Sequence, residues 1–391
     1  MALALLTTTA CKDDEEHLSA EPYQVLDRIL ETNDIYFYDA LQTMFSNNGI
    51  TEEMQKPYKQ QIQAAAMKSR AYKAYTIAYH TTDPHGKPIV ASGVVYYPKS
   101  GKPRGVIEAV SFNNDKYMCP SQELKNIEVL LGMAGYIVVT ADHIGHGITT
   151  ELVTPFFNHD NAVKVNVDLR AAATELVRNV YGHNMPQWTL ITGMSLAASE
   201  AWALARYYQQ HPERGVRVNQ IWVCGGAYKP VEVFAQQFRT RFTNYALIPN
   251  VIYSVNHYDN LGLDLSQVFR GELSQHYEEW CTGKVKIFEL TEMLGTDLSN
   301  YLNYDFFNDA NEGYLRLKAS IEQFSIPNDW VPEAAVHIYH ARNDTFVPYE
   351  SSERLVDYLR SVGVNVDFVV TDNDHTDNCL VMGTDIAKVL Y

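Results

Sequence analysis

The sequence predicts an α/β fold, in which helices flank a mainly parallel sheet of about eight strands, and three observations point to it. Runs rich in β-branched residues alternate with helical stretches over most of the chain. A turn containing glycine and serine joins one such run to a helix. About a hundred residues between Cys224 and Val336 interrupt the alternation, which predicts a helical domain inserted into the fold.

The composition is that of a large globular chain. It has 391 residues, of which 46% are hydrophobic and 20% charged, so a sizeable core is available. The net charge of −16 argues against nucleic acid or an anionic membrane surface as a partner. No apolar stretch reaches about 18 residues, so we expect no transmembrane helix.

The N-terminus predicts export. Residues Met1–Cys11 resemble the end of a lipoprotein signal peptide, in which Cys11 would carry the lipid. The acidic run Lys12–Glu16 resembles a signal by which some Gram-negative bacteria display lipoproteins on the outer membrane. We therefore expect residues 1–16 to be a signal remnant and an acidic tether that place the protein at the cell surface. A frayed cytosolic N-terminus is the alternative.

Residues 17–70 are expected to form an N-terminal helical segment with a packing or lid role. Helical spacing of apolar residues begins at Glu21, and a second amphipathic stretch covers Thr51–Lys68. The apolar residues that suggest the first helix are Tyr23, Leu26, Ile29 and Leu30.

The first part of the α/β core is expected over residues 71–229. Tyr72–Thr81 and Ile89–Tyr97 alternate like strands and are joined by a turn at Asp83–Lys87, which predicts a hairpin. Further β-type runs are Val106–Ser111, Ile137–Ala141, Thr189–Thr192, Gln220–Cys224, Val336–Tyr339 and Val366–Val370. Helical stretches separate most of these runs, so the sheet should be mainly parallel.

The motif Gly193–Ala197 suggests a nucleophile. The apolar run Trp188–Thr192 precedes it and a helical stretch, Ala198–Tyr207, follows it. Such a strand–turn–helix layout lifts a serine hydroxyl above the sheet, close to the unpaired N–H groups of the new helix. We therefore predict that Ser195 attacks an acyl carbon. The alternative is a serine at an ordinary strand-to-helix turn.

A candidate acid follows the β-type run Ala335–His340. Asp344 lies in the turn-rich loop Ala341–Pro348, at the strand end where open α/β sheets carry their sites. Asp344 could instead cap a turn or the helix expected at Tyr349–Leu359.

A candidate base follows the next strand. His375 lies in the loop Thr371–Asn378, about thirty residues beyond Asp344, which is the spacing of one helix and one strand. It is the only histidine after His340. The second part of the core, residues 331–391, thus supplies an acid and then a histidine, in the order that a serine nucleophile of this type requires.

Residues 230–330 are expected to form the inserted domain. Amphipathic helical segments fill it, and aromatic residues are frequent. These aromatic residues are Phe234, Phe238, Phe242, Tyr245, Tyr253, Tyr258, Tyr277, Trp280, Tyr301, Tyr304, Phe306, Phe307 and Tyr314. They could shape an apolar or aromatic pocket, or, for most of them, form the core of the insertion itself.

From about Ala74 to the C-terminus the chain resembles the α/β-hydrolase superfamily, and more narrowly its secreted lipase and esterase branch. Gly135–Gly147 is similar to that family's strand and glycine-rich loop, and His340–Asp344 with Val347 and Pro348 is similar to its acid loop. The motif around Ser195 is similar to its nucleophile turn, although Ala197 stands where glycine is usual.

The resemblance implies roles for further residues. The backbone N–H of Leu196 would be one oxyanion donor, and a group near Asn113 or Asn114 would be the second. The insertion would be a cap over the nucleophile. The resemblance implies no metal and no organic cofactor.

The predicted activity is hydrolysis of carboxylic esters, small or glycan-linked, through the catalytic residues Ser195, His375 and Asp344 and an acyl-enzyme. Two alternatives stay open. One is a prolyl or aminoacyl peptidase on the same scaffold, and the other is a surface lipoprotein that binds a ligand without catalysis. The remaining cysteines have no metal-type spacing, and whether any of them pair stays open; they are Cys119, Cys224, Cys281 and Cys379.

Overall fold

A computed structural model describes residues 24–47, 50–56, 59–111, 119–375 and 377–391. Its centre is a nine-stranded sheet with the order β1-β2-β3-β5-β4-β6-β7-β8-β9. The sheet is mainly parallel and flanked by helices, as the sequence predicts, with one strand more than expected.

Antiparallel pairing is confined to one side of the sheet. Strands β1, β2 and β3 pair antiparallel, and β3 also runs antiparallel to β5. All pairs from β5 through β4 to β9 are parallel. The strands are β1 (Leu26–Ile35), β2 (Tyr72–Thr82), β3 (Pro88–Pro98), β4 (Val106–Ala109), β5 (Ile137–Ala141), β6 (Trp188–Met194), β7 (Arg217–Cys224), β8 (Ala335–Ala341) and β9 (Val366–Thr371).

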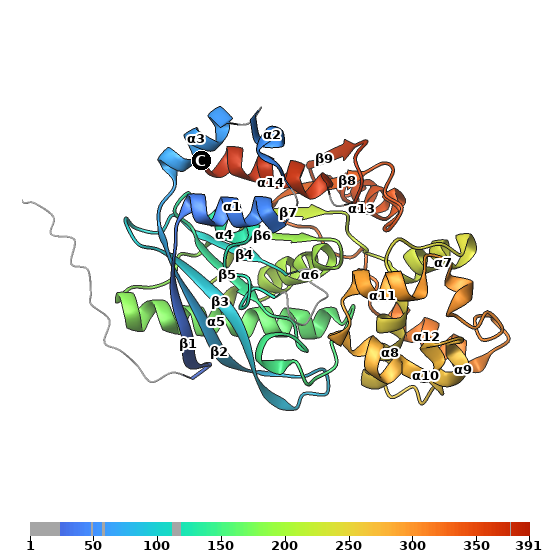
Figure 1. Cartoon of the computed structure of the whole chain (residues 1–391). Coiled ribbons are helices and arrows are strands. Elements are labelled where there is room, and N and C mark those ends of the chain that lie inside the picture. Colours follow the sequence, from blue (N-terminus) through green and yellow to red (C-terminus); the bar gives the residue numbers. More distant parts are fainter. Residues whose placement is uncertain (1–23, 48–49, 57–58, 112–118, 376) are drawn as a thin grey trace, which may run out of the picture.

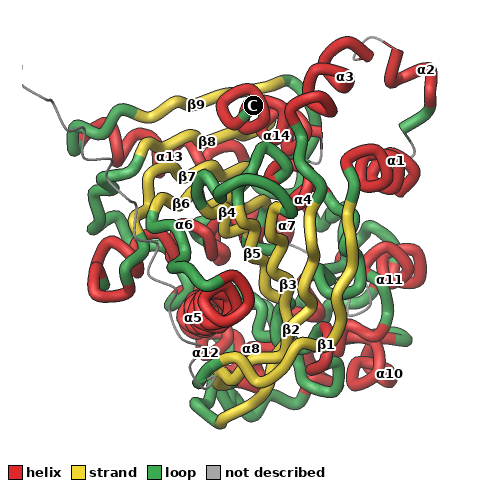
Figure 2. The backbone as a smooth tube through the Cα atoms, turned by 90° about the vertical axis from the view of Figure 1, so that its left-hand side faces the viewer, coloured by secondary structure: helices red, strands yellow, loops and turns green. Residues whose placement is uncertain are grey.

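Helices cover both faces of the sheet (Figure 2). One face carries α5 (His159–Tyr181), α6 (Leu196–Gln210) and α13 (Tyr349–Ser361). The other carries α1 (Phe37–Asn47), α4 (Ile127–Gly132) and α14 (Asp377–Leu390). The alternation along β7 explains the two layers, because Ile221 and Val223 pack with α6 whereas Trp222 and Cys224 pack with α14.

The helical prediction for the N-terminal segment is wrong over Leu26–Ile35, which forms the edge strand β1. Its backbone pairs with β2 from Leu26 opposite Tyr79 to Ile35 opposite Tyr72. Leu26 and Ile35 are buried, whereas Ile29 and Leu30 are each 38% exposed, so the helical spacing does not correspond to a buried face. Most of the described residues after β1 in this segment are helical: after α1 come α2 (Glu52–Gln55) and α3 (Lys59–Lys68).

The predicted hairpin is confirmed. Strands β2 and β3 pair without interruption, and the turn between them closes with a hydrogen bond from the Asp83 N–H to the Lys87 carbonyl.

Helices occupy the insertion between β7 and β8, which lies to one side of the sheet (Figure 1, yellow to orange). They are α7 (Pro230–Thr240), α8 (Ile248–Tyr258), α9 (Leu265–Val268), α10 (Leu273–Glu279), η4 (Trp280–Lys284), α11 (Ile287–Leu294), η5 (Leu298–Asn300) and α12 (Glu312–Glu322). Short turns η2 (Gly147–Thr149) and η3 (Pro212–Arg214) lie in the core. Many of the predicted aromatic residues pack into the insertion's own core, among them Phe234, Tyr301 and Phe306.

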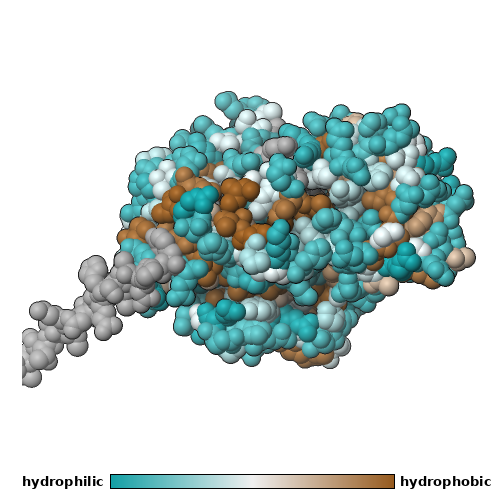
Figure 3. Space-filling view, turned by 90° about the horizontal axis from the view of Figure 1, so that it is seen from below, coloured by the Kyte–Doolittle hydropathy of each residue, from teal (hydrophilic) through white to brown (hydrophobic). Residues whose placement is uncertain are grey.

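The face seen in Figure 3 is mostly hydrophilic, with apolar side chains gathered in its middle. Among the residues that the structure describes, none of the helices combines the length and apolarity needed to cross a membrane. Cys11 and the tether predicted for residues 1–16 lie outside the described residues.

Candidate active site

Ser195 lies in a strained turn between β6 and α6. Its backbone has φ 57° and ψ −122°, a conformation that non-glycine residues rarely adopt. A Cβ at Gly193 would lie 2.2 Å from the Ala197 carbonyl oxygen, so only glycine fits before the serine. The turn is held to the sheet by a 2.8 Å hydrogen bond from the Ser195 N–H to the Cys224 carbonyl.

The structure brings the three predicted residues together. Ser195 Oγ lies 2.9 Å from His375 Nε2, and His375 Nδ1 lies 2.5 Å from Asp344 Oδ2. The three side chains come from the loops that follow β6, β8 and β9, whose carboxyl ends meet at one edge of the parallel sheet. His375 and Asp344 are buried, whereas Ser195 is partly exposed. A hydroxyl, an imidazole and a carboxylate so ordered can transfer a proton from the serine.

Asp344 is held as a carboxylate. Its Oδ1 accepts hydrogen bonds of 2.9 and 2.8 Å from the N–H groups of Phe346 and Val347. Burial alone would raise the pKa of Asp344, but interactions with His340 and His375 outweigh burial and hold the pKa well below its ordinary value. A permanently charged Asp344 fixes the His375 tautomer that leaves Nε2 free to accept the serine proton.

His340 is a second histidine at Asp344 that sequence reasoning did not assign to the site. Its ring is fully buried; Nδ1 lies 2.7 Å from Ser352 Oγ and Nε2 lies 3.0 Å from the Val347 carbonyl. Because a carbonyl only accepts, Nε2 carries the proton, and it also lies 3.3 Å from Asp344 Oδ2. His340 therefore helps to orient the carboxylate through Oδ2, whereas the backbone donors hold Oδ1. Its place in the motif before Asp344 was the only sequence signal.

The His375 ring is enclosed on two sides. At Gly225 (φ 59°) a Cβ would lie 3.0 Å from the His375 ring, so glycine lets the ring approach β7 closely. The Phe346 ring meets the His375 ring edge-on, with centroids 5.3 Å apart.

The predicted oxyanion donors are placed in part. Leu196 is the first residue of α6, so its N–H is one of the unpaired donors at a helix N-terminus. Asn113 and Asn114 lie outside the described residues. The described residues before them are held firmly: the Val110 N–H donates to the Thr192 carbonyl at 2.9 Å, and the Ser111 carbonyl lies 2.5 Å from His143 Nε2.

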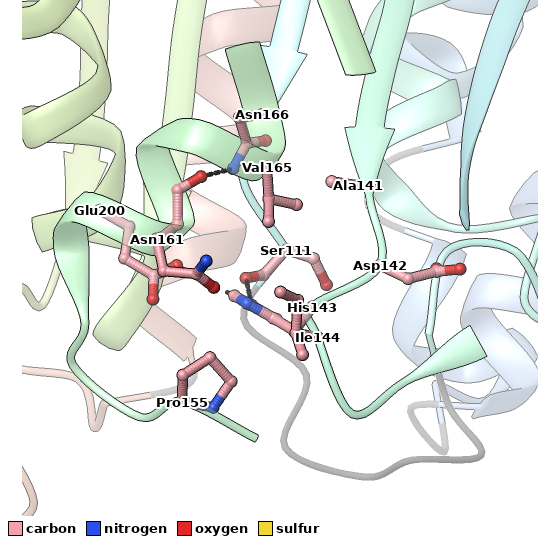
Figure 4. A pocket seen from close by; sticks show the side chains of 11 residues that line it. Ser111, Ala141, Asp142, His143, Ile144, Pro155, Asn161, Val165, Asn166 and Glu200 are labelled. Atoms are coloured by element: carbon pink, nitrogen blue, oxygen red, sulfur yellow. Dashed lines mark hydrogen bonds and ion pairs between the residues drawn. The ribbon is translucent and has the colours of Figure 1, made fainter. Parts of the chain in front are cut away.

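A small polar cavity lies beside this segment, lined among others by Glu200, His143, Asn161 and Ser111 (Figure 4). Glu200, on α6, is only 3% exposed, and its Oε2 lies 3.8 Å from His143 Nε2. Burial raises the pKa of Glu200 to about 7, although His143 opposes the rise. A buried acid thus lies one helical turn beyond the nucleophile turn, and no sequence pattern had indicated it.

The four cysteines of the described residues are free thiols: Cys119, Cys224, Cys281 and Cys379. This answers the question that the sequence left open. The Cys379 thiol donates a hydrogen bond to the Cys224 sulfur at 3.7 Å, and no disulfide joins the two.

The comparisons with known proteins give structural relatives only. No protein-family model and no curated protein sequence matches the chain. Among solved structures it is similar to a variant of the rice cell wall degrading esterase LipA from Xanthomonas oryzae, with a TM-score of 0.76 and 19% identity, covering 92% of this chain and 96% of that one.

Two further structures are similar. A protein of Legionella pneumophila described as a hydrolase has a TM-score of 0.75 and 17% identity, with 94% of this chain and 97% of that chain covered. Candida antarctica lipase A has a TM-score of 0.58 and 12% identity, with 89% and 77% covered. With its strand order and its nucleophile turn, the chain has the α/β-hydrolase fold of these esterase and lipase structures.

Proposed function

We propose that the protein is a serine hydrolase that cleaves carboxylic esters. The observation that carries the proposal is the unbroken hydrogen-bonded chain from Ser195 through His375 to Asp344. The nucleophile of this chain of residues lies on a strained turn, at the sheet edge where this architecture carries its sites.

The proposed reaction has two steps. His375 takes the Ser195 proton as the serine oxygen attacks the ester carbonyl, and Asp344 stabilises the imidazolium that results. The Leu196 N–H and a donor near Asn113 or Asn114 bind the oxyanion. His375 then protonates the leaving alcohol, and water repeats the sequence on the acyl-enzyme, which regenerates the serine.

The surroundings of Ser195 favour apolar substrate groups. Leu196, Phe157 and Val347 belong to one apolar cluster with the core of the insertion, so the insertion reaches the nucleophile. This supports the proposal that the insertion is a cap over the site. That solved structures of this fold include a cell wall degrading esterase and a lipase supports ester substrates, small or glycan-linked.

The experiment that tests the activity is hydrolysis of p-nitrophenyl esters from acetate to palmitate. Ser195→Ala should remove turnover on the order of 10⁵-fold or more while the unfolding temperature stays close to that of the wild type. Ser361→Ala, on the far end of α13, is the matched control and should retain full activity. Equal rates for Ser195→Ala and wild type would contradict the proposal.

The same assay tests the alternatives. A peptidase would leave the esters intact and cleave aminoacyl or prolyl p-nitroanilides in a Ser195-dependent way. A ligand-binding protein would cleave neither class.

We also propose that the protein is exported and held at the outer membrane by a lipid on Cys11. Cys11→Ser should move the protein from the membrane fraction to the soluble fraction, as judged by fractionation of Gram-negative cells and surface labelling. Unchanged membrane association of this variant would contradict the proposal.

A further inference from the structure

A line of aromatic rings runs outward from the catalytic histidine. The His375 ring contacts Phe346 at 5.3 Å between centroids, Phe346 contacts Tyr245 at 4.8 Å, and Tyr245 contacts Phe288 at 5.5 Å. All three contacts are edge-to-face. Exposure grows along the line, from the buried His375 through the half-buried Phe346 and Tyr245 to Phe288, which is 63% exposed.

Phe346, Tyr245 and Phe288 come from three separate segments, which are the loop after β8, the loop between α7 and α8, and helix α11. Hydrogen bonds tie the segments together on both sides of Tyr245. Asn244 Nδ2 donates to Thr345 Oγ1 at 2.7 Å, and the Ala246 N–H donates to Thr291 Oγ1 at 2.9 Å. The line is therefore preorganised rather than a chance meeting of mobile side chains.

Of the three rings, Phe346 packs against the core of the insertion, whereas Tyr245 and Phe288 are not part of that core. That core is formed by other aromatic residues, such as Phe269 and Tyr301, which are almost fully buried. Phe288 instead presents most of its ring to solvent, on a helix that also exposes half of Met293. The apolar surface of Phe288 and Met293 thus stays exposed in the folded protein, and the line of rings connects it to His375.

The chemistry of the site decides which part of a substrate meets the line. This step rests on the proposed function. His375 delivers a proton to the leaving oxygen, so the alcohol part of an ester must lie against His375 when the bond breaks. A group attached to that alcohol then meets Phe346 first, and Tyr245 and Phe288 further out.

We propose that Phe346, Tyr245 and Phe288 form the binding subsite for the alcohol part of the ester, and that this alcohol carries a flat apolar ring. Flat apolar groups pack well against aromatic faces and edges, whereas a short alkyl alcohol would not reach beyond Phe346. Burial, followed by the carboxylates of Asp374 and Asp344, raises the pKa of Tyr245. These carboxylates place negative charge beside the line of rings, which disfavours a negatively charged alcohol group. We therefore expect the ring of the substrate alcohol to be uncharged.

The experiment compares two acetate esters whose leaving alcohols have similar acidity: 2-(1-naphthyl)ethyl acetate and butyl acetate. The two esters share the same acyl group, and their alcohols leave with similar ease. A difference in kcat/KM between them therefore reports on how the site binds the alcohol part. We expect the wild type to prefer the naphthyl ester at least tenfold in kcat/KM. Tyr245→Ala and Phe288→Ala should each raise KM for this ester about three- to tenfold while kcat/KM for butyl acetate changes less than twofold. Met67→Ala, an exposed apolar residue on α3, is the matched control.

The outcomes separate this inference from the proposed function. Ser195-dependent hydrolysis of both esters at equal kcat/KM, or preference for the naphthyl ester that survives both alanine variants, would overturn the subsite and leave the esterase intact. Hydrolysis that persists in Ser195→Ala would overturn the proposed function itself. A fold defect in Tyr245→Ala would lower the unfolding temperature and both kcat/KM values together. In that case the result for Phe288→Ala, at an exposed position, decides whether the subsite exists.

Discussion

The two halves of the sheet differ in what they do for the site. In the parallel half, β6, β8 and β9 end at one edge and place Ser195, Asp344 and His375 within hydrogen-bonding reach of one another. In the antiparallel half, β1, β2 and β3 contribute none of these three side chains. The first half positions these three side chains, whereas the second extends the sheet as far as the edge strand β1.

Because of this difference, we expect substitutions at the ends of the parallel strands to lower activity and substitutions at the antiparallel edge to lower stability. Loops at the carboxyl ends of parallel strands carry polar groups whose geometry matters to tenths of an ångström. The antiparallel edge depends on apolar burial and backbone pairing, which contribute to the free energy of unfolding.

The largest effect is expected at Asp344. Asp344→Asn should lower kcat for ester hydrolysis on the order of 10⁴-fold, because the amide can no longer fix the required tautomer of His375. Steady-state kinetics on p-nitrophenyl acetate measure this, and circular dichroism checks the fold. A fall in kcat of less than tenfold would contradict the proposal that Asp344 is the acid.

The next effect belongs to the antiparallel edge. Leu26 is 2% exposed in the core under β1, so Leu26→Ala should lower the free energy of unfolding by about 3 kcal/mol. The kcat of the folded protein should stay within about twofold. Leu30→Ala, on the same strand but 38% exposed, is the control and should cost much less. Urea unfolding and initial rates on the same samples provide both readouts, and a large fall in kcat would mean that the two halves are coupled.

Glu200 gives a pH-dependent effect. Its pKa is about 7 in the folded protein and 4.5 ordinarily, so the unfolded chain releases this proton first as pH rises. The contribution of Glu200 to stability is therefore present below pH 4.5 and is lost between pH 4.5 and 7. Glu200→Gln cannot ionise and should be more stable than wild type by an amount on the order of 3 kcal/mol at pH 8, but by only about 1 kcal/mol at pH 5.

Urea unfolding of both proteins at pH 5 and pH 8 measures this difference. Glu213→Gln, which removes an exposed carboxylate with a lowered pKa, is the control and should not show a gain that grows with pH. Parallel stability curves for Glu200→Gln and the wild type would contradict the buried, protonated acid.

The smallest effect is expected at His340. His340→Ala removes a donor to Asp344 and should lower kcat about tenfold with KM little changed, while His340→Gln should restore part of the loss. The same change removes a hydrogen bond that lowers the pKa of Asp344, so the loss of kcat should grow as pH falls toward the ordinary pKa of a carboxyl group. A purely structural role would lower stability and leave the pH profile in place.

The parallel half could be predicted from the sequence because it carries strong local signals. Its central strands β4, β5 and β6 are buried along almost their whole length, and Ser195, Asp344 and His375 each follow within four residues of the end of a strand. Their chain order then singled them out among many serines, acids and histidines.

The rest depends on contacts that a sequence does not express. The edge strand β1 is polar along most of its length, and its pairing with β2 is made by the backbone, so chance spacing of Leu26, Ile29 and Leu30 was misleading. His340 and Glu200 are ordinary polar residues of a strand and a helix until burial places them beside Asp344 and His143. The ring line from Phe346 to Phe288 joins segments far apart in the chain.

The separation of the proposed nucleophile from its proposed base along the chain also sets the order in which the site is completed. Ser195 and His375 are 180 residues apart, and the insertion and the last two strands lie between them. At a synthesis rate of about 5–20 residues per second, Ser195 leaves the ribosome about 10–35 seconds before its base. Throughout that interval the growing chain carries a serine with no partner to activate it. Hydrolytic chemistry would thus be the last property that a newly made molecule acquires.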